Sequence, residues 1–340
     1  MKRNGKELIL NVMDHNPVEL IPWVPYTGVH AGFLKGFTAQ EVLQDADKLL
    51  EALLEVNNRY LPDGQPVCFD LQIEAEALGC GLQWASDMPP SVISHPLGNT
   101  NDIPDRMISR EDGRIPVVLR ACRQLREQVG EHTAIYGLFC GPFTLASHLR
   151  GSQLFLDMVM NPQYVNRLID YCSRIAMQMA GNYMDEDCDV IAPVDPLISQ
   201  ISPKHFDQFC SAAYTEMFDL IRARNKASSF FVCGNAIKNI EVMCQTGPDG
   251  ISVDENVDLV AAREITDSYD LVIGGNIPTT TMMMYGTPEE TAQYVFDLLE
   301  TIDPRRNFIL SPGCDIPYSV PAENVEAAAR AALGPEGMRR

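Results

Sequence analysis

Long apolar runs are the first feature that this 340-residue chain lacks. No apolar run approaches 18 residues, so we expect no transmembrane helix. The basic N-terminus is followed by a short apolar run that soon reaches Asp14 and His15, which is not the pattern of a signal peptide. Positive charge is also scarce, with 26 Lys and Arg against 46 Asp and Glu and a net charge of −20. This balance argues against nucleic acid and anionic membranes as partners.

The ten cysteines lack the dense spacing of a small disulfide-bonded secreted protein. In a chain of this length they indicate reduced thiols, most of them packed as small apolar side chains, and a cytoplasmic location. A hydrophobic content of 46% and a charged content of 21% are typical of a globular protein. We expect one domain over residues 1–340.

Short apolar or aromatic runs alternate with longer amphipathic stretches along the chain. The short runs predict strands at residues 22–26, 67–71, 134–139, 189–193, 228–233, 249–253, 271–275 and 307–311. Apolar residues at helical spacing predict helices at 39–59, 162–185, 203–224, 287–302 and 321–333. Ser202-Pro203 and Thr287-Pro288 are signals for the start of a helix.

Eight strands that alternate with helices predict an α/β fold, a (β/α)8 TIM barrel. The alternative is an open doubly wound sheet, but no Gly-x-Gly-x-x-Gly turn follows the first strand. Segments 81–132 and 140–161 are too long for simple crossovers, so we expect extra helices or hairpins inserted in the N-terminal half.

Active sites of such barrels lie at the carboxyl ends of the strands. Two cysteines and a glutamate occupy such positions, Cys233, Glu255 and Cys314. Two thiolates and a carboxylate form a candidate zinc site with three protein ligands. Phe231 stands where a histidine might complete the set, and its side chain cannot bind a metal. The third ligand beside the two cysteines is therefore Glu255 or, as alternatives, His30, Glu74, Glu76 or water. A site without metal is the remaining alternative.

Other strand ends carry candidates for acid–base chemistry. Glu74 and Glu76 follow the second strand, where burial could raise a carboxyl pKa, although acids also favour a helix start. His30 lies in a loop of small residues after the first strand, and Asp195 follows the fourth. We interpret all four as candidate catalytic residues. A structural or solvated role is the alternative for each of them.

Several segments together resemble the uroporphyrinogen decarboxylase superfamily, which also contains corrinoid-dependent methyltransferases. The resemblance spans nearly the whole chain and is carried by Phe69-Asp70-Leu71, Glu74–Gly79, Gly141–Ala146, Cys233-Gly234-Asn235, Gly250–Glu255, Gly275-Asn276 and Ser311–Cys314. It implies a (β/α)8 barrel, in agreement with the strand count. In the decarboxylases Arg-Gln-Ala-Gly-Arg follows the first strand, whereas this chain has Thr27-Gly28-Val29-His30-Ala31. The resemblance therefore favours the methyltransferase branch over decarboxylation.

The zinc-dependent methyltransferases of the superfamily carry His-x-Cys, then an acid and a distant Cys. Cys233, Glu255 and Cys314 match the last three positions, and Phe231 departs from the first. The resemblance implies methyl transfer to or from a corrinoid that a separate corrinoid-binding protein carries. We interpret Phe231 as favouring the demethylating branch, in which a methoxylated aromatic or another small methylated molecule is the donor.

The expected substrate-binding residues are Tyr26, Phe231, Asn235 and Asn276, with Met residues of 282–284 beside Tyr26 and Phe231 in an apolar pocket. The alternative activities are methyl transfer from methylcobalamin to a thiol or folate, and uroporphyrinogen decarboxylation. A catalytically silent corrinoid- or tetrapyrrole-binding accessory protein is the alternative from another class.

Overall fold

A parallel sheet of seven strands forms the centre of the computed structural model, which describes residues 4–337. Its strand order is β1-β4-β5-β6-β7-β8-β9. The strands are β1 (Gly64–Pro66), β4 (Ala134–Cys140), β5 (Val190–Val194), β6 (Ala227–Val232), β7 (Gly250–Val253), β8 (Val272–Ile277) and β9 (Phe308–Pro312). All six pairings are parallel, so the carboxyl ends of the strands meet at one end of the sheet.

The segment around Trp23 closes this sheet into a barrel. Trp23 forms a parallel bridge with Leu310 of β9, and the Val24 N–H donates to the Leu310 carbonyl at 3.0 Å. On the other side, the Asp63 N–H donates to the Trp23 carbonyl at 2.9 Å, just before β1. The segment predicted as the first strand therefore fills the gap between β9 and β1 and completes the set of eight. The predicted (β/α)8 barrel is confirmed.

The second strand lies three residues before the predicted range 67–71. Gly64 pairs with Ala134 and Pro66 with Tyr136, and the Val67 N–H makes a last bond to the Tyr136 carbonyl at 3.1 Å. The apolar run after Val67 is buried at the strand end, where Phe69 packs inside the barrel. The run after Val67 is therefore apolar because its side chains are buried, and not because its backbone pairs with a neighbouring strand.

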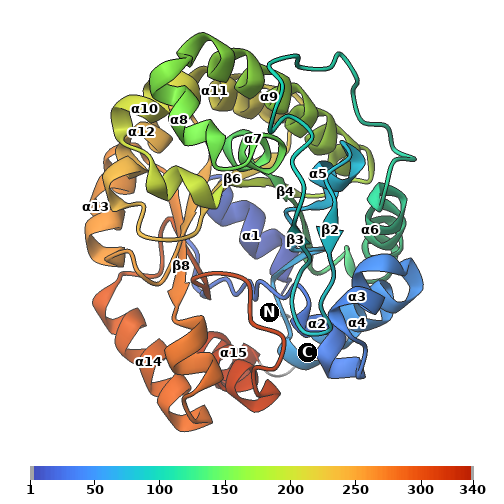
Figure 1. Cartoon of the computed structure of the whole chain (residues 1–340). Helices are drawn as coiled ribbons and strands as arrows, with labels where there is room; N and C mark the ends of the chain where they lie inside the picture. Colours follow the sequence, from blue (N-terminus) through green and yellow to red (C-terminus); the bar gives the residue numbers. More distant parts are fainter. Residues whose placement is uncertain (1–3, 338–340) are drawn as a thin grey trace.

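Most helices surround the strands as an outer ring, whereas α1 is drawn at the centre, inside that ring (Figure 1). The helices are α1 (Gly5–Met13), α2 (His30–Lys35), α3 (Ala39–Gln44), α4 (Ala46–Tyr60), α5 (Ile73–Ala77), α6 (Ile115–Val129), α7 (Pro142–Arg150), α8 (Gln153–Met160), α9 (Pro162–Asp185), α10 (Pro203–Phe209), α11 (Ser211–Ala223), α12 (Ile240–Cys244), α13 (Leu259–Ser268), α14 (Pro288–Thr301) and α15 (Ala322–Gly337). The predicted helix 39–59 is interrupted at Asp45, whose side chain caps α4. The predicted helix 203–224 is divided at Cys210.

The N-terminal half contains the expected insertions. An antiparallel hairpin of β2 (Leu82–Gln83) and β3 (Ser91–Val92) precedes α6, and α7 and α8 lie between β4 and the long helix α9. The hairpin is drawn in front of the barrel strands in Figure 1. These additions place polypeptide over one side of the carboxyl-terminal face.

Two apolar clusters fill the molecule. The inner cluster includes Tyr26, Tyr136 and Phe231 and is joined by Ile9 and Val12 of α1. The outer cluster packs the ring of helices onto the strands. Within residues 4–337, no helix combines the length and apolarity that a membrane crossing requires.

Candidate functional site

Cys233 and Cys314 meet at the carboxyl-terminal face of the barrel. Cys233 follows the last residue of β6, Cys314 lies two residues beyond β9, and their Sγ atoms are 3.0 Å apart. The hydrogen bond that Cys233 donates lowers the pKa of Cys314, whereas this bond and burial raise the pKa of Cys233 well above its usual value. The pair therefore ionises in sequence, with Cys314 first.

Asp254 brings a carboxylate to this pair of thiols. It follows β7 directly, as Cys233 follows β6, and its ligand atom lies with both sulfurs in a group no more than 4.8 Å across. The Gly234 N–H donates to Oδ2 at 2.8 Å and the Asn256 N–H to Oδ1 at 2.8 Å, which holds the carboxylate in place. Each carboxylate oxygen can accept more than one contact. Two thiols and this carboxylate fit a zinc ion as a donor set.

Glu255 lies beside this cluster but points its carboxylate elsewhere. Its Oε2 accepts hydrogen bonds from the N–H and hydroxyl of Thr279, at 2.7 and 3.0 Å, where the π-helical turn η3 (Thr279–Met284) begins. The three-ligand group found among the described residues contains Asp254 in its place. That Glu255 ligates a metal therefore stays a prediction, and Asp254 is a candidate ligand that the sequence reasoning missed.

The two asparagines of the predicted substrate site lie on either side of the cluster. Asn276 is buried and its Nδ2 donates to the carbonyls of Asp254 and Val257, at 3.0 and 2.9 Å. It therefore fixes the loop that carries Asp254. Asn235 is exposed, and its side-chain oxygen accepts the Ile237 N–H at 3.4 Å. Contact of either residue with substrate stays a prediction.

Phe231 and Tyr26 lie below the thiols, inside the barrel. Their ring centroids are 4.6 Å apart, and Phe69 packs edge-on against Phe231 at 5.5 Å. Phe231 is only 1% exposed, and the Tyr26 hydroxyl pairs with Ser252 at 3.1 Å. Met283, by contrast, is buried in the outer cluster. A shared pocket of Phe231, Tyr26 and the methionines of 282–284, and contact of these residues with substrate, therefore stay predictions.

The two predicted acids Glu74 and Glu76 occupy different environments. Glu76 accepts a hydrogen bond from Arg114 at 2.6 Å, and the same guanidinium pairs with Asp70 at 2.5 Å. Glu74 is fully buried, accepts the Cys140 N–H at 3.1 Å and has no hydrogen-bond partner for Oε2. Burial raises the pKa of Glu74 to about 7.

His30 is enclosed at the start of α2. Its Nδ1 pairs with the Tyr318 carbonyl at 3.0 Å and its Nε2 with the Tyr60 hydroxyl at 2.7 Å. Burial lowers the pKa of His30 to about 4, so the ring is neutral near pH 7. Both nitrogens are engaged, which supports a structural role in joining the N- and C-terminal parts of the chain; a catalytic role for His30 stays a prediction.

Asp195 is also held by several donors. Its carboxylate accepts hydrogen bonds from the Phe143 and Thr144 N–H groups at 2.9 and 3.0 Å, from the Thr144 hydroxyl at 2.5 Å and from the Tyr214 hydroxyl at 2.6 Å. Burial raises the pKa of Asp195 to about 6, although these bonds oppose the shift. The residue anchors the first turn of α7, which supports a positioning role for it; catalysis by Asp195 stays a prediction.

Asp315 is a further buried acid that the sequence reasoning did not identify. Its Oδ1 accepts the Gly28 N–H at 2.6 Å, and a Cβ on Gly28 would lie 2.6 Å from Oδ2. Burial and the adjacent Cys314 raise the pKa of Asp315 well above its usual value. The signal for Asp254 was its place directly after a strand, equivalent to that of Cys233. Asp315 and Arg114 carried no comparable signal.

Comparison with known proteins gives the chain its family. Residues 4–333 match the uroporphyrinogen decarboxylase (URO-D) family. Methylcobamide:CoM methyltransferase MtbA of Methanosarcina acetivorans is 29% identical over 330 residues, covering 94% of this chain and 95% of that protein. Methylcobamide:CoM methyltransferase MtaA of Methanosarcina barkeri is 30% identical, covering 77% and 76%.

A solved structure described as a methyltransferase from Methanosarcina mazei has the same fold, with a TM-score of 0.88 and 24% sequence identity. The superposition covers 97% of this chain and 98% of that one. The motifs, the barrel and these relatives agree. The chain belongs to the uroporphyrinogen decarboxylase family, in its methyltransferase branch.

Proposed function

We propose that this chain is a corrinoid-dependent methyltransferase whose reaction takes place beside Cys233, Asp254 and Cys314. A methyl group would move between the cobalt of a corrinoid, presented by a separate corrinoid-binding protein, and a small molecule. The observation that carries the proposal is the cluster of two thiols and a carboxylate at the open face of the barrel. The names of the relatives MtbA and MtaA support the same class of reaction.

Cys233, Cys314 and Asp254 would hold a zinc ion in this site. Bound zinc supplies a Lewis acid that deprotonates a thiol or polarises an ether oxygen. The protein itself orients the ligands: the Gly234 and Asn256 N–H groups fix Asp254, and Asn276 fixes its backbone. The aromatic cluster under the thiols keeps water out of the barrel interior.

Uroporphyrinogen decarboxylation fits the described residues less well. A substrate with many carboxylates needs unpaired cationic side chains. Arg114 is already matched by Asp70 and Glu76, and Arg150 by Asp157 at 2.7 Å. We therefore favour methyl transfer.

Two directions of transfer are supported by different observations. The thiols and the names of the relatives favour transfer from methylcobamide to a thiol. Phe231, in the place of a histidine, favours the demethylation of a small methylated donor, such as a methoxylated aromatic compound. In both directions a cytoplasmic setting is expected for a reduced pair of cysteines.

Absorption spectroscopy separates the two directions. The purified protein is loaded with zinc and mixed either with methylcob(III)alamin and a set of thiols, or with cob(I)alamin and a set of methoxyarenes. Consumption of methylcob(III)alamin supports thiol methylation, and its formation supports demethylation. Absence of both reactions contradicts the proposed function. Cys314→Ser should lower the rate by about a hundredfold or more, whereas Cys244→Ala, which changes a cysteine of α12, should retain it.

Metal analysis tests the ligand set directly. We expect about one zinc per chain after loading and dialysis. Asp254→Asn should weaken zinc binding by about tenfold to a hundredfold because it removes a charged ligand. Glu255→Gln should have little effect because that carboxylate contacts Thr279. The reverse order of the two variants would identify Glu255 as the ligand and contradict the assignment of Asp254.

A further inference from the structure

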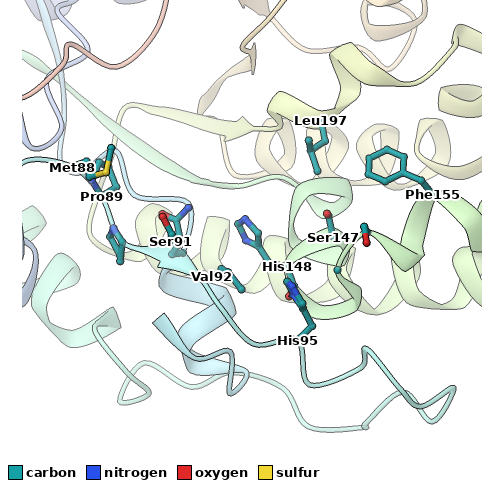
Figure 2. Close-up of a pocket in the computed structure, with 13 residues that line it drawn as sticks. Met88, Pro89, Ser91, Val92, His95, Ser147, His148, Phe155 and Leu197 are labelled. Atoms are coloured by element: carbon teal, nitrogen blue, oxygen red, sulfur yellow. The ribbon is translucent and has the colours of Figure 1, made fainter. Parts of the chain in front are cut away.

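A cavity of about 550 Å³ lies under the inserted hairpin at the carboxyl-terminal face. Its walls come from the loop after β1, from α7 and the start of α8, from the short helix η1 (Pro196–Gln200) and from the hairpin segment 88–95. Met88, Val92, Phe155 and Leu197 form apolar parts of the wall. Figure 2 shows the ring of His148 among these lining residues, between Ser91 and Ser147.

The cavity contains polar atoms without partners. Gln72 Oε1 and His148 Nδ1 are both buried and make no hydrogen bond within the described part of the chain. An unmade hydrogen bond on a buried polar atom costs roughly 1–3 kcal/mol. Two such atoms in the wall of one cavity are therefore suited to a ligand that pairs with them.

The roof of the cavity is preformed. The His95 Nδ1 lies 2.8 Å from the His148 carbonyl, and because a carbonyl oxygen only accepts, Nδ1 is the donor of this hydrogen bond. The Leu97 N–H donates to the Leu149 carbonyl at 2.9 Å, and Arg150 donates to the Leu97 carbonyl at 2.5 Å. These bonds tie the segment after β3 to α7, which lowers the entropic cost of forming the cavity on binding.

The lining has no charged side chain, although the whole protein carries a net charge of −20. Its two histidines are the titratable members, and burial lowers the pKa of His148 to about 4. An ionised group placed here would lose its hydration without gaining a counter-ion, which is strongly unfavourable. The wall therefore selects against carboxylates, sulfonates and phosphates.

The helix η1 connects this cavity with the thiol cluster. Leu197 lines the cavity, and Ser199 of the same helix approaches the backbone beside Cys233 so closely that a Cβ on Gly234 would lie 2.8 Å from the Ser199 Oγ. Gln72 also follows Asp70, in the loop after β1. A ligand in the cavity is thus held beside the face where the thiols lie.

We propose that this cavity binds an uncharged, partly apolar small molecule that forms hydrogen bonds with Gln72 and His148. The identification of this molecule as the methyl donor or acceptor rests on the proposed function. Its binding to the cavity is independent of the proposed function. A neutral phenolic methyl ether has this chemistry, since its ring suits the apolar wall and its hydroxyl can pair with both polar atoms. The small-molecule substrate would then differ from an anionic thiol.

Equilibrium binding to the protein without corrinoid tests the proposal. Isothermal titration compares guaiacol, which is neutral, with vanillate and 3-methoxytyramine, which add an anionic and a cationic group to the same ring. Guaiacol should bind at least about tenfold more tightly than either charged probe. No binding of guaiacol, or equal binding of a charged probe, would overturn the proposal. Because no methyl transfer is needed, guaiacol that binds but is not demethylated would contradict its role as methyl donor and would leave the binding proposal standing.

Variants locate the bound molecule. Gln72→Leu and His148→Phe should each weaken guaiacol binding by about tenfold through a lost hydrogen bond, whereas Gln128→Leu, on the exposed face of α6, should not. Gln72→Lys should reverse the preference toward vanillate by providing a cation. This gain cannot result from misfolding. Unchanged binding in Gln72→Leu and an unchanged preference in Gln72→Lys would place the ligand elsewhere and overturn the assignment.

Discussion

Glu74 combines full burial, one hydrogen bond and one unpartnered oxygen. Its pKa of about 7 lies above its ordinary value of 4.5, so the folded state holds the proton more tightly than the unfolded state does. The stability from this group is complete below pH 4.5 and is lost as the pH rises through 7. Glu74 therefore makes the fold weaker, not stronger, in alkaline solution.

Glu74→Gln should remove this pH dependence, because glutamine keeps an acceptor for the Cys140 N–H and does not ionise. Relative to the parent protein, the variant should gain about 3 kcal/mol in free energy of unfolding at pH 8 and little at pH 4.5. Urea denaturation at the two pH values measures the difference. Glu131→Gln, which changes an exposed glutamate, is the control; the same gain at both pH values would contradict the raised pKa.

The residue scale also shows what could be predicted for the site. The thiols were found because their strand-end positions are visible in the sequence, and the same rule selected Glu255, one residue beyond the carboxylate that lies with them. Asp254 and Glu255 are neighbours, and only the fold decides which carboxylate faces the sulfurs. The pairing of Arg114 with Asp70 joins residues 44 positions apart, which no local pattern indicates.

At the scale of elements, α7 depends on a carboxylate from the next strand end. Gly141 precedes the helix and offers no side-chain cap, so Asp195 accepts the N–H groups of Phe143 and Thr144 instead. α7 also carries Ser147 and His148 into the cavity wall. Asp195 thereby positions part of the proposed binding site from outside it.

Asp195→Ala should lower the free energy of unfolding by about 3–5 kcal/mol, because four donors lose their acceptor at once. Asp195→Asn should lose less, because its remaining carbonyl oxygen still accepts. Chemical denaturation measures both values, and guaiacol binding should fall in the same order. Unchanged stability with a lost reaction rate would support a catalytic role for Asp195 and contradict the positioning role.

The elements themselves were largely predictable, since apolar period and helix-start residues are local properties. The second strand was displaced because the apolar run after Val67 is buried without pairing. The breaks at Asp45 and Cys210 were missed because the apolar spacing continues across them. In each case tertiary contacts, not the local pattern, set the boundary.

At the scale of the whole molecule, the barrel is closed by contacts between the two ends of the chain. Trp23 pairs with Leu310, the Gly28 N–H donates to Asp315, and His30 contacts the Tyr318 carbonyl. We call this junction between residues 23–30 and 310–318 the seam. Gly28 is suited to the seam because a Cβ there would lie only 2.6 and 2.7 Å from the two Asp315 carboxylate oxygens. The seam is therefore close-packed and sensitive to added volume.

Gly28→Ala should destabilise the protein by about 1–3 kcal/mol, because the methyl group displaces Asp315 from its hydrogen bond. Gly181→Ala in α9 is a matched control, since nothing lies within 4 Å of the added Cβ. The control should stabilise the protein by about 0.5–1 kcal/mol through helix propensity. Thermal denaturation compares the two variants with the parent protein. Equal stability of Gly28→Ala and the parent would show that Asp315 can move aside without cost, which would contradict the prediction.

The seam also determines when the molecule becomes complete during synthesis. The hydrogen bond from Gly28 to Asp315 spans 287 residues, so the barrel cannot close until the chain as far as Asp315 has left the ribosome. Cys314 joins Cys233 in the same late stretch of chain. A nascent chain therefore cannot assemble the cluster of Cys233, Asp254 and Cys314 early, and the assembled cluster marks a finished barrel.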